Sequence, residues 1–292
     1  MTGPASAMLD ELRAALRPHG LFLRGVVDVG GESDPPGSRN IEAGTIFPSL
    51  PRGEGVRRAD EGVSPDILSQ PSPSSDPSGH LLPAGEKGGA SRSSGGDGPA
   101  LDDGSRARSI VLIGNIGGSA WHSFSAWRKA RPDIADPLDT WSKAVLRPLA
   151  ACFGATAYFP SDPPWQPFQR WAMQAEGLKP SPLGILIHPV YGLWHGYRGA
   201  FGFREQLEVP VPETAVHPCE SCLEKTCLTH CPAGAITLEG FQYQPCRAHL
   251  RSSAGEAGCM QAGCLARAAC PVGVEYQYPP EQLQFHMAAL ER

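Results

Sequence analysis

The stretch that decides the fold of the C-terminal part reads CESCLEKTCLTHCP, residues 219–232. Its cysteines follow the spacing Cys219-x2-Cys222-x4-Cys227-x3-Cys231, and a proline comes directly after the last of them. In a reducing compartment thiols at such short separations favour metal or cluster ligation over disulfides. The stretch therefore predicts a small domain held together by coordination.

A second group of cysteines follows downstream and also ends in Cys-Pro. It contains Cys246 and then Cys259-x4-Cys264-x5-Cys270. Eight of the nine cysteines thus lie between residues 219 and 270. Because four thiolates are the normal complement of a [4Fe–4S] cluster, the two groups predict two such clusters.

The ligand pairing follows from the rule for two-cluster ferredoxins, in which the last cysteine of each motif serves the other cluster. By that rule the first cluster is held by Cys219, Cys222, Cys227 and Cys270. The second is held by Cys231, Cys246, Cys259 and Cys264. The exchange ties the two halves together, and coordination supplies folding free energy that burial cannot supply in so small a segment.

Two other uses of the cysteines stay open. A structural zinc site needs four ligands and would leave half of these cysteines idle. Disulfides fit a secreted chain, whereas the N-terminus carries Asp10, Glu11 and Arg13 and lacks the apolar run of a secretory signal.

The segment Cys231-Pro232-Ala233-Gly234-Ala235-Ile236 resembles the way the first motif of bacterial-type ferredoxin domains continues into the next strand. Residues 211–292 are therefore similar to a two-cluster ferredoxin-like domain. The spacing departs from that family between Cys222 and Cys227, where four residues stand in place of two, and the second motif is longer throughout.

The residues before this domain alternate between helical and strand patterns, which predicts a mixed α/β sandwich. Leu9, Leu12 and Leu16 share a helix face before Gly20, and a strand follows within residues 1–33. In residues 106–210 we expect a buried strand at 109–113, a turn through Gly114–Gly118, a helix at 138–149 and a strand at 155–159. A helix from Phe168, closed by Gly177, follows them. Pro148 is expected to kink or end the second helix, and Cys152 to be a buried, inert thiol.

Residues 34–105 interrupt this domain with a Gly/Pro/Ser-rich composition that offers few apolar side chains to bury. Such a segment cannot offset its own ordering entropy, so we expect a largely disordered insertion without catalytic residues. Pro210-Val211-Pro212 then predicts the linker to the cysteine-rich domain.

The run Ile187-His188-Pro189-Val190-Tyr191-Gly192-Leu193-Trp194-His195-Gly196-Tyr197-Arg198-Gly199 resembles a segment of the cyanocobalamin decyanases. Those cobalamin-processing enzymes have a nitroreductase-like α+β fold, and the likeness covers about Arg108–Pro210. Epoxyqueuosine reductases and reductive dehalogenases show the same domain order, with a cobalamin-binding domain before a two-cluster ferredoxin module.

This resemblance implies that the clusters pass electrons to a corrinoid held by the first domain. The residues it places in the cofactor pocket are His188, Tyr191, Trp194 and Arg198. The alternative interpretation makes the aromatics core residues, the histidine a buried hydrogen-bonded group and the arginine an ion-pair partner.

The net charge of −5 and the sequence pI near 6.0 come with no Lys/Arg-rich stripe. Nucleic acid and anionic membranes are therefore not expected as partners. With no apolar run of spanning length either, the sequence predicts a soluble, cytoplasmic chain.

Three functions follow from these patterns. The first is an iron–sulfur electron-transfer protein that exchanges electrons with a redox partner protein. The second is a cobalamin-dependent reductase, an oxidoreductase whose clusters feed a corrinoid. The third is a zinc-stabilised interaction module, in which the cysteines are structural.

Overall fold

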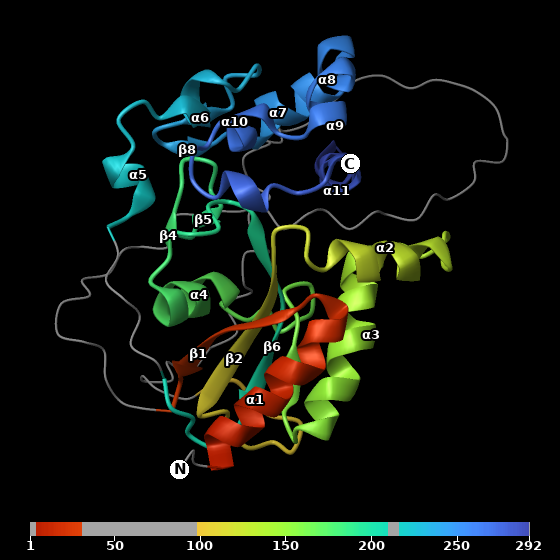
Figure 1. The fold of residues 1–292 in the computed structure, drawn as a ribbon, viewed down its shortest axis with the longest axis vertical. Helices are drawn as coiled ribbons and strands as arrows, with labels where there is room; N and C mark the ends of the chain where they lie inside the picture. The colour runs from red at the N-terminus through yellow and green to blue at the C-terminus, as the bar shows by residue number, and fades with distance from the viewer. Residues whose placement is uncertain (1–3, 31–97, 210–215, 292) are drawn as a thin grey trace, which may run out of the picture. The chain divides into compact units, whose positions relative to one another are not determined.

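The computed structural model describes residues 4–30, 98–209 and 216–291. Helices and strands are mixed along the chain, which confirms the α+β class (Figure 1). Within these residues no helix is both long and apolar enough to span a bilayer.

The central sheet has four antiparallel strands. In spatial order they are β1 (Phe22–Asp28), β2 (Ser109–Ile116), β6 (His195–Phe203) and β3 (Thr156–Tyr158). Strand β2 is buried along almost its whole length, because it pairs on both edges and is covered on both faces. Its apolar run Ile110–Ile113 was the strand predicted from the sequence.

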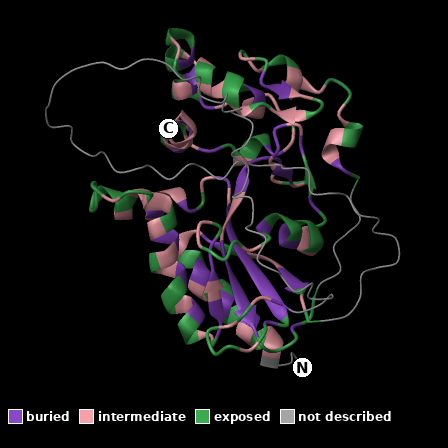
Figure 2. Cartoon of the chain, turned by 180° about the vertical axis from the view of Figure 1, so that it is seen from behind, coloured by how far each residue is buried: buried purple, intermediate pink, exposed green. Residues whose placement is uncertain are grey.

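Helices cover both faces of this sheet, and the buried residues form two cores, one on each side (Figure 2). One face carries α1 (Pro4–Leu16), α2 (Trp121–Lys129) and α3 (Pro137–Cys152). The other face carries α4 (Phe168–Glu176) and lies beside the small hairpin of β4 (Lys179–Pro180) and β5 (Leu186–Ile187). The result is a helix–sheet–helix sandwich, as the alternating pattern predicted.

The first helix and strand agree with the sequence prediction, since α1 and the short 3-10 helix Arg17–His19 end at Gly20, whose φ is +67°. The helix α3 does not end at Pro148, which lies on its exposed side, where water can satisfy the carbonyl that loses its donor. The prediction for Cys152 is wrong. Cys152 is exposed, because the helix ends there and the apolar face has already turned inward at Ala150.

The predicted insertion extends less far than expected at its C-terminal end. Residues 98–105 form a turn packed against β3, where the Tyr158 hydroxyl donates to Ala100 O at 2.9 Å and Asp102 N donates to Thr156 Oγ1 at 2.8 Å. These bonds tie the turn to the sandwich, so residues 98–105 belong to the folded domain and not to the predicted insertion. The rest of the predicted insertion and the linker Pro210–Pro212 lie outside the described residues.

The cysteine-rich part consists of short elements. In chain order they are α5 (Pro218–Ser221), α6 (Thr226–Thr229), β7 (Ile236–Thr237), β8 (Gly240–Phe241), α7 (Tyr243–Leu250), α8 (Ser253–Ala257), α9 (Cys259–Ala262), α10 (Leu265–Ala268), the 3-10 helix η3 (Val274–Tyr276) and α11 (Pro280–Glu291). Most helices here have four or five residues, too few to be stable alone.

The cysteine-rich part and the sandwich touch backbone to backbone. A Cβ added to Gly192 would lie 1.9 Å from Val272 O, and one added to Gly273 would lie 2.4 Å from the Tyr191 carbonyl carbon. Nearby, Gly117 packs in the same way on Tyr276. Only glycine permits so close an approach, and it also accepts the positive φ found at all three positions.

We predict that Gly192→Ala destabilises the chain far more than Gly154→Ala. Both glycines have φ near +60°, but no atom lies within 4 Å of a Cβ added at Gly154. The control should cost about 1 kcal/mol of backbone strain, and Gly192→Ala about 2 kcal/mol or more beyond it. Urea unfolding of both variants measures the difference, and equal losses would contradict this packing.

Candidate functional site

The eight cysteines lie in two sets of four. The negative charge of one cysteine raises the pKa of the cysteines close to it. Every such effect joins two cysteines of the same set, and none joins the two sets. The first set contains Cys219, Cys222, Cys227 and Cys270. The second set contains Cys231, Cys246, Cys259 and Cys264. The two sets have the residue composition of the crossed pairing, and the ligation of clusters by them stays a prediction.

The first set surrounds a cavity of about 30 Å³ that also touches the sandwich domain. Its apolar wall comes from Leu183, Ile187 and Leu193 of the β4–β6 region, and from Pro271 and Val272 after the last cysteine. Burial, followed by the charges of the three neighbouring thiols, raises the pKa of Cys219 to about 11. Such thiols stay protonated at neutral pH unless a bound cation makes their thiolates favourable.

The second set lies against α11. Cys246 comes from α7 and Cys259 begins α9, and both pack with Leu250 and Met287 in one small apolar core. Burial, followed by the charges of its three partners, raises the pKa of Cys246 to about 12. One backbone amide already points at this set, since Ala235 N donates to Cys231 Sγ at 3.3 Å.

Zinc and iron–sulfur clusters place different demands on a set of four cysteines. A zinc ion needs four sulfurs at about 2.3 Å from a single point. In a [4Fe–4S] cluster each of the four thiolates binds a different iron. Among the described residues, no three His, Cys, Asp or Glu side chains converge closely enough to hold one metal ion.

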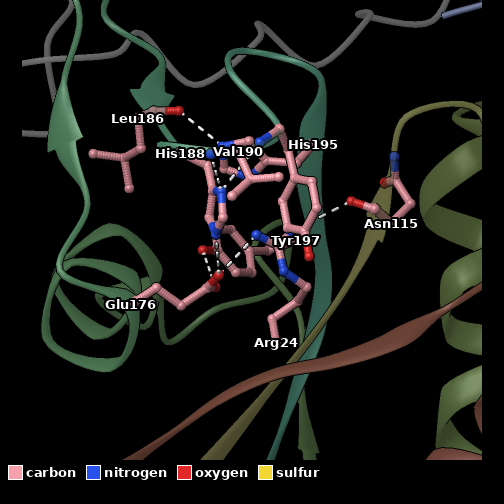
Figure 3. A network of polar contacts seen from close by, with 9 residues as sticks. Arg24, Asn115, Glu176, Leu186, His188, Val190, His195 and Tyr197 are labelled. Carbon is pink, nitrogen blue, oxygen red and sulfur yellow. Dashed lines mark hydrogen bonds and ion pairs between the residues drawn. The ribbon is translucent and has the colours of Figure 1, made fainter. Parts of the chain in front are cut away.

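A second polar site lies on the α4 face of the sheet, around Glu176 at the end of α4 (Figure 3). Glu176 Oε2 accepts from Arg24 Nη2 at 2.8 Å, and Glu176 Oε1 accepts from the Tyr197 hydroxyl at 2.6 Å. The Arg24 and Glu176 side chains are 2% and 9% exposed, so this is a buried, hydrogen-bonded ion pair. The Arg24 guanidinium also lies over the rings of Tyr191 and Tyr197.

The two histidines of this network have defined hydrogen bonds. His188 Nδ1 accepts from the amides of Val190 and Tyr191, so its neutral ring carries the proton on Nε2, 3.7 Å from Glu176 Oε2. His195 Nε2 donates to Leu186 O at 2.9 Å, leaving Nδ1 buried without a partner among the described residues. Burial, followed by the charge of Arg24, lowers the pKa of His188 to about 4 and that of His195 to about 3. Both rings are therefore neutral at pH 7.

The four residues predicted to line a corrinoid pocket are not all brought together. His188 and Tyr191 stack with ring centroids 4.1 Å apart, on the α4 face. Trp194 is 1% exposed, and its ring is covered by the Arg267 guanidinium and by Tyr278. The Trp194 indole therefore has no free face for a corrin ring in this structure.

Arg198 lies on the opposite face of the sheet. It is the extra residue of a β-bulge, since Ile113 pairs with Gly199 while Gly114 pairs with Tyr197. Its side chain lines a cavity of about 20 Å³ together with Asn115, Ala120, Trp121, Phe124, Leu138, Gln282 and His286. Arg198 Nε and Gln282 Oε1 are both buried without a hydrogen-bond partner among the described residues. This second cavity includes none of the other three predicted residues.

Several residues of these sites were not found from the sequence. Arg24 could have been identified because a charged residue interrupts an apolar strand there. Glu176 has no sequence feature that marks it as a site residue beyond its place at a helix end. The burial of His195, which is 6% exposed, was not found from the sequence either. Its burial depends on the β5–β6 loop, a contact with no local sequence signature.

We predict that His195 makes the chain less stable in acid. Because its folded pKa lies below the ordinary 6.5, protonation favours unfolding, so the stability present above pH 6.5 is lost as the pH falls toward 3. At pH 5 the loss from this ring is about 2 kcal/mol. His195→Gln retains a donor for Leu186 O but does not titrate.

Urea unfolding of wild type and His195→Gln at pH 7 and pH 5 tests this. The free energy of unfolding of wild type should fall more steeply, and parallel pH dependences would contradict the assignment.

Comparison with known proteins finds similarity to solved structures. No family model and no curated protein matches the chain. Two solved structures to which the chain is similar are both of epoxyqueuosine reductase. One is the selenomethionine-labelled enzyme, with a TM-score of 0.37, 15% identity, and coverage of 61% of this chain and 52% of that one. The other contains an epoxyqueuosine-modified tRNA-Tyr stem loop, with a TM-score of 0.37, 16% identity, and coverage of 61% and 54%. The chain therefore spans about half the length of each structure.

Proposed function

We propose that this chain is an iron–sulfur electron-transfer protein that carries two [4Fe–4S] clusters. The observation that carries the proposal is the division of eight cysteines into two crossed sets of four, the first around a cavity. When bound, each cluster can take up and release one electron. The sandwich domain then serves as the platform on which the cysteine-rich part is fixed.

The residues around the first set are suited to holding a cluster away from water. Leu183, Ile187 and Leu193 form an apolar wall, and Lys225 Nζ donates to Cys219 O at 2.9 Å. The lysine charge also lowers the pKa of Cys219 against the larger effect of burial. The lysine charge favours the thiolate that a cluster needs, and the apolar wall keeps water away from a bound cluster.

The crossed sets support clusters over zinc on a second ground. Cys231 belongs to the first motif in sequence but lies with Cys246, Cys259 and Cys264. A zinc-knuckle module would pair the neighbours Cys219-x2-Cys222 and Cys227-x3-Cys231 around one ion. The exchange of Cys231 and Cys270 is the pattern of two-cluster ferredoxins.

We predict that the wild-type chain, purified without oxygen, contains about eight iron atoms, and that Cys231→Ala contains about four. The remaining cluster should be the one held by Cys219, Cys222, Cys227 and Cys270. Iron and acid-labile sulfide analysis, with EPR after dithionite reduction, measures both. The matched control is Cys152→Ala, which removes the exposed ninth cysteine and should leave the iron content unchanged.

The outcomes separate the candidate functions. Stoichiometric zinc without iron would return the chain to the zinc-stabilised module. If Cys231→Ala removed the cluster of Cys219, Cys222 and Cys227 while the other remained, the crossed pairing would be refuted.

A cobalamin-dependent reductase is the second candidate, and one observation favours it. Arg198 Nε is buried without a hydrogen-bond partner and borders a cavity, which is an arrangement that a polar or anionic ligand group would satisfy. Under this candidate Arg198 would hold an amide or phosphate of the corrinoid, and the clusters would supply electrons to it. The buried Trp194 would not stack on the corrin ring.

If the second candidate is correct, cobalamin added to the pure protein should co-elute with it and change its absorption spectrum. Arg198→Gln should then weaken binding about tenfold, as expected for losing one charge-assisted contact. Arg204→Gln, which changes a surface arginine by the same charge, is the control. Absence of co-elution with the cluster-loaded wild type would remove this candidate and leave the electron-transfer proposal standing.

A further inference from the structure

Ser181 is a buried polar residue in the wall of the cavity that the first cysteine set surrounds. It comes directly after β4, in the turn that joins β4 to β5, and is 7% exposed. The cavity is also lined by all four cysteines of the set, Cys219, Cys222, Cys227 and Cys270. A serine of the sandwich domain and the four thiols therefore border one common space.

The Ser181 hydroxyl has no hydrogen-bond partner among the described residues. The backbone of the same residue is satisfied within the turn, because Ser181 N donates to Ile185 O at 2.9 Å and Ser181 O accepts from Gly184 N at 2.8 Å. Its neighbours in the wall, Leu183 and Ile187, are apolar. A buried hydroxyl without a partner costs about 1–3 kcal/mol, so a partner in the cavity itself is expected.

The other polar side chains of this wall are already engaged. Besides the cysteines and Ser181, these are Lys225 and Thr226. Lys225 Nζ donates to Cys219 O at 2.9 Å, and the Thr226 hydroxyl donates to Ala269 O at 2.6 Å. The Ser181 hydroxyl is thus the donor that remains for whatever occupies the cavity.

We propose that the Ser181 hydroxyl donates a hydrogen bond to a sulfur of the cluster held by the first set, and that it raises the reduction potential of this cluster. This rests on the proposed function, because it requires that cluster. Hydrogen bonds to the sulfurs are among the features that set the potential of an iron–sulfur cluster. On reduction the cluster gains one electron and one negative charge, so a donor stabilises the reduced form more than the oxidised form.

The sandwich domain holds this donor in place. Gly192 packs against Val272, which follows Cys270 and Pro271, so close that a side chain at Gly192 would collide with the Val272 carbonyl. Ser181 and Val272 line the same cavity. The platform therefore takes part in setting the potential of the cluster that it borders.

The test is a redox titration of the cluster-loaded full chain, followed by EPR. Ser181→Ala should lower the midpoint of one cluster by about a tenfold change in the ratio of reduced to oxidised form at fixed potential, which is about 59 mV for one electron. The midpoint of the other cluster should stay the same. Combined with Cys231→Ala, which keeps the cluster of the first set, Ser181→Ala should give the same shift.

Two further variants separate the hydroxyl from packing. Ser181→Thr and Ser181→Val introduce side chains of nearly the same shape, but only threonine keeps the donor. The midpoint should stay close to wild type in Ser181→Thr and fall in Ser181→Val. Pulsed EPR of the reduced protein in D2O should also show an exchangeable deuteron coupled to the cluster in wild type that is missing in Ser181→Val.

The matched control is Ser142→Ala. Ser142 is 2% exposed, and its hydroxyl already donates to Leu138 O at 2.8 Å within α3. Loss of this hydroxyl removes a buried hydrogen bond of the sandwich that does not involve the cavity. Both midpoints should therefore stay unchanged.

Failure of this inference can be told apart from failure of the proposed function. If wild type carries two clusters and Ser181→Ala leaves both midpoints unchanged, something other than the cluster satisfies the hydroxyl, and the inference is overturned while the electron-transfer function stands. If Ser181→Thr shifts as far as Ser181→Val, packing is responsible, and the inference is overturned as well. If wild type holds no iron, the proposed function fails and the inference fails with it.

Discussion

The close approach of two backbone segments is the constraint on which the rest of the structure depends. Val272 and Gly273, which directly follow the last cysteine and its proline, lie on Tyr191 and Gly192 with no space for a side chain between them. This contact fixes how the cysteine-rich part meets the β5–β6 loop. It therefore places the cavity of the first cysteine set against Leu183, Ile187 and Leu193.

The same segment continues into α11, which gives the cysteine-rich part a second anchor. Phe285 of α11 packs on Trp121 and Phe124 of the sandwich, while Met287 of the same helix packs with Cys259 of the second set. Short helices with four or five residues cannot supply such order themselves. The proposed clusters hold these short segments on one side and the sandwich holds them on the other, and these contacts supply their stability.

Local patterns predicted the sandwich well, because its information lies within single elements. The leucine periodicity of α1, the apolar run of β2 and the helix-ending Gly20 and Gly177 specify structure within a few residues. The crossed cysteine sets could be inferred as well, because a general rule of cluster ligation links distant positions. The polar network of Arg24, Glu176 and His195 could not, since it joins strands and a helix far apart in the sequence. Helical periodicity also predicted wrongly that Cys152 is buried, because the last turn of a helix can point away from the core.

Three arginines with buried nitrogen atoms show how differently one side chain can be used. Arg24 is neutralised by Glu176 and lies over two tyrosine rings, which makes its contribution structural. Arg198 borders a cavity and Arg267 lies between aromatic rings, and neither has an acidic partner among the described residues. Leaving a charged side chain partly buried without an acidic partner is costly. The ion pair with Glu176 spares Arg24 that cost, whereas Arg198 and Arg267 carry it.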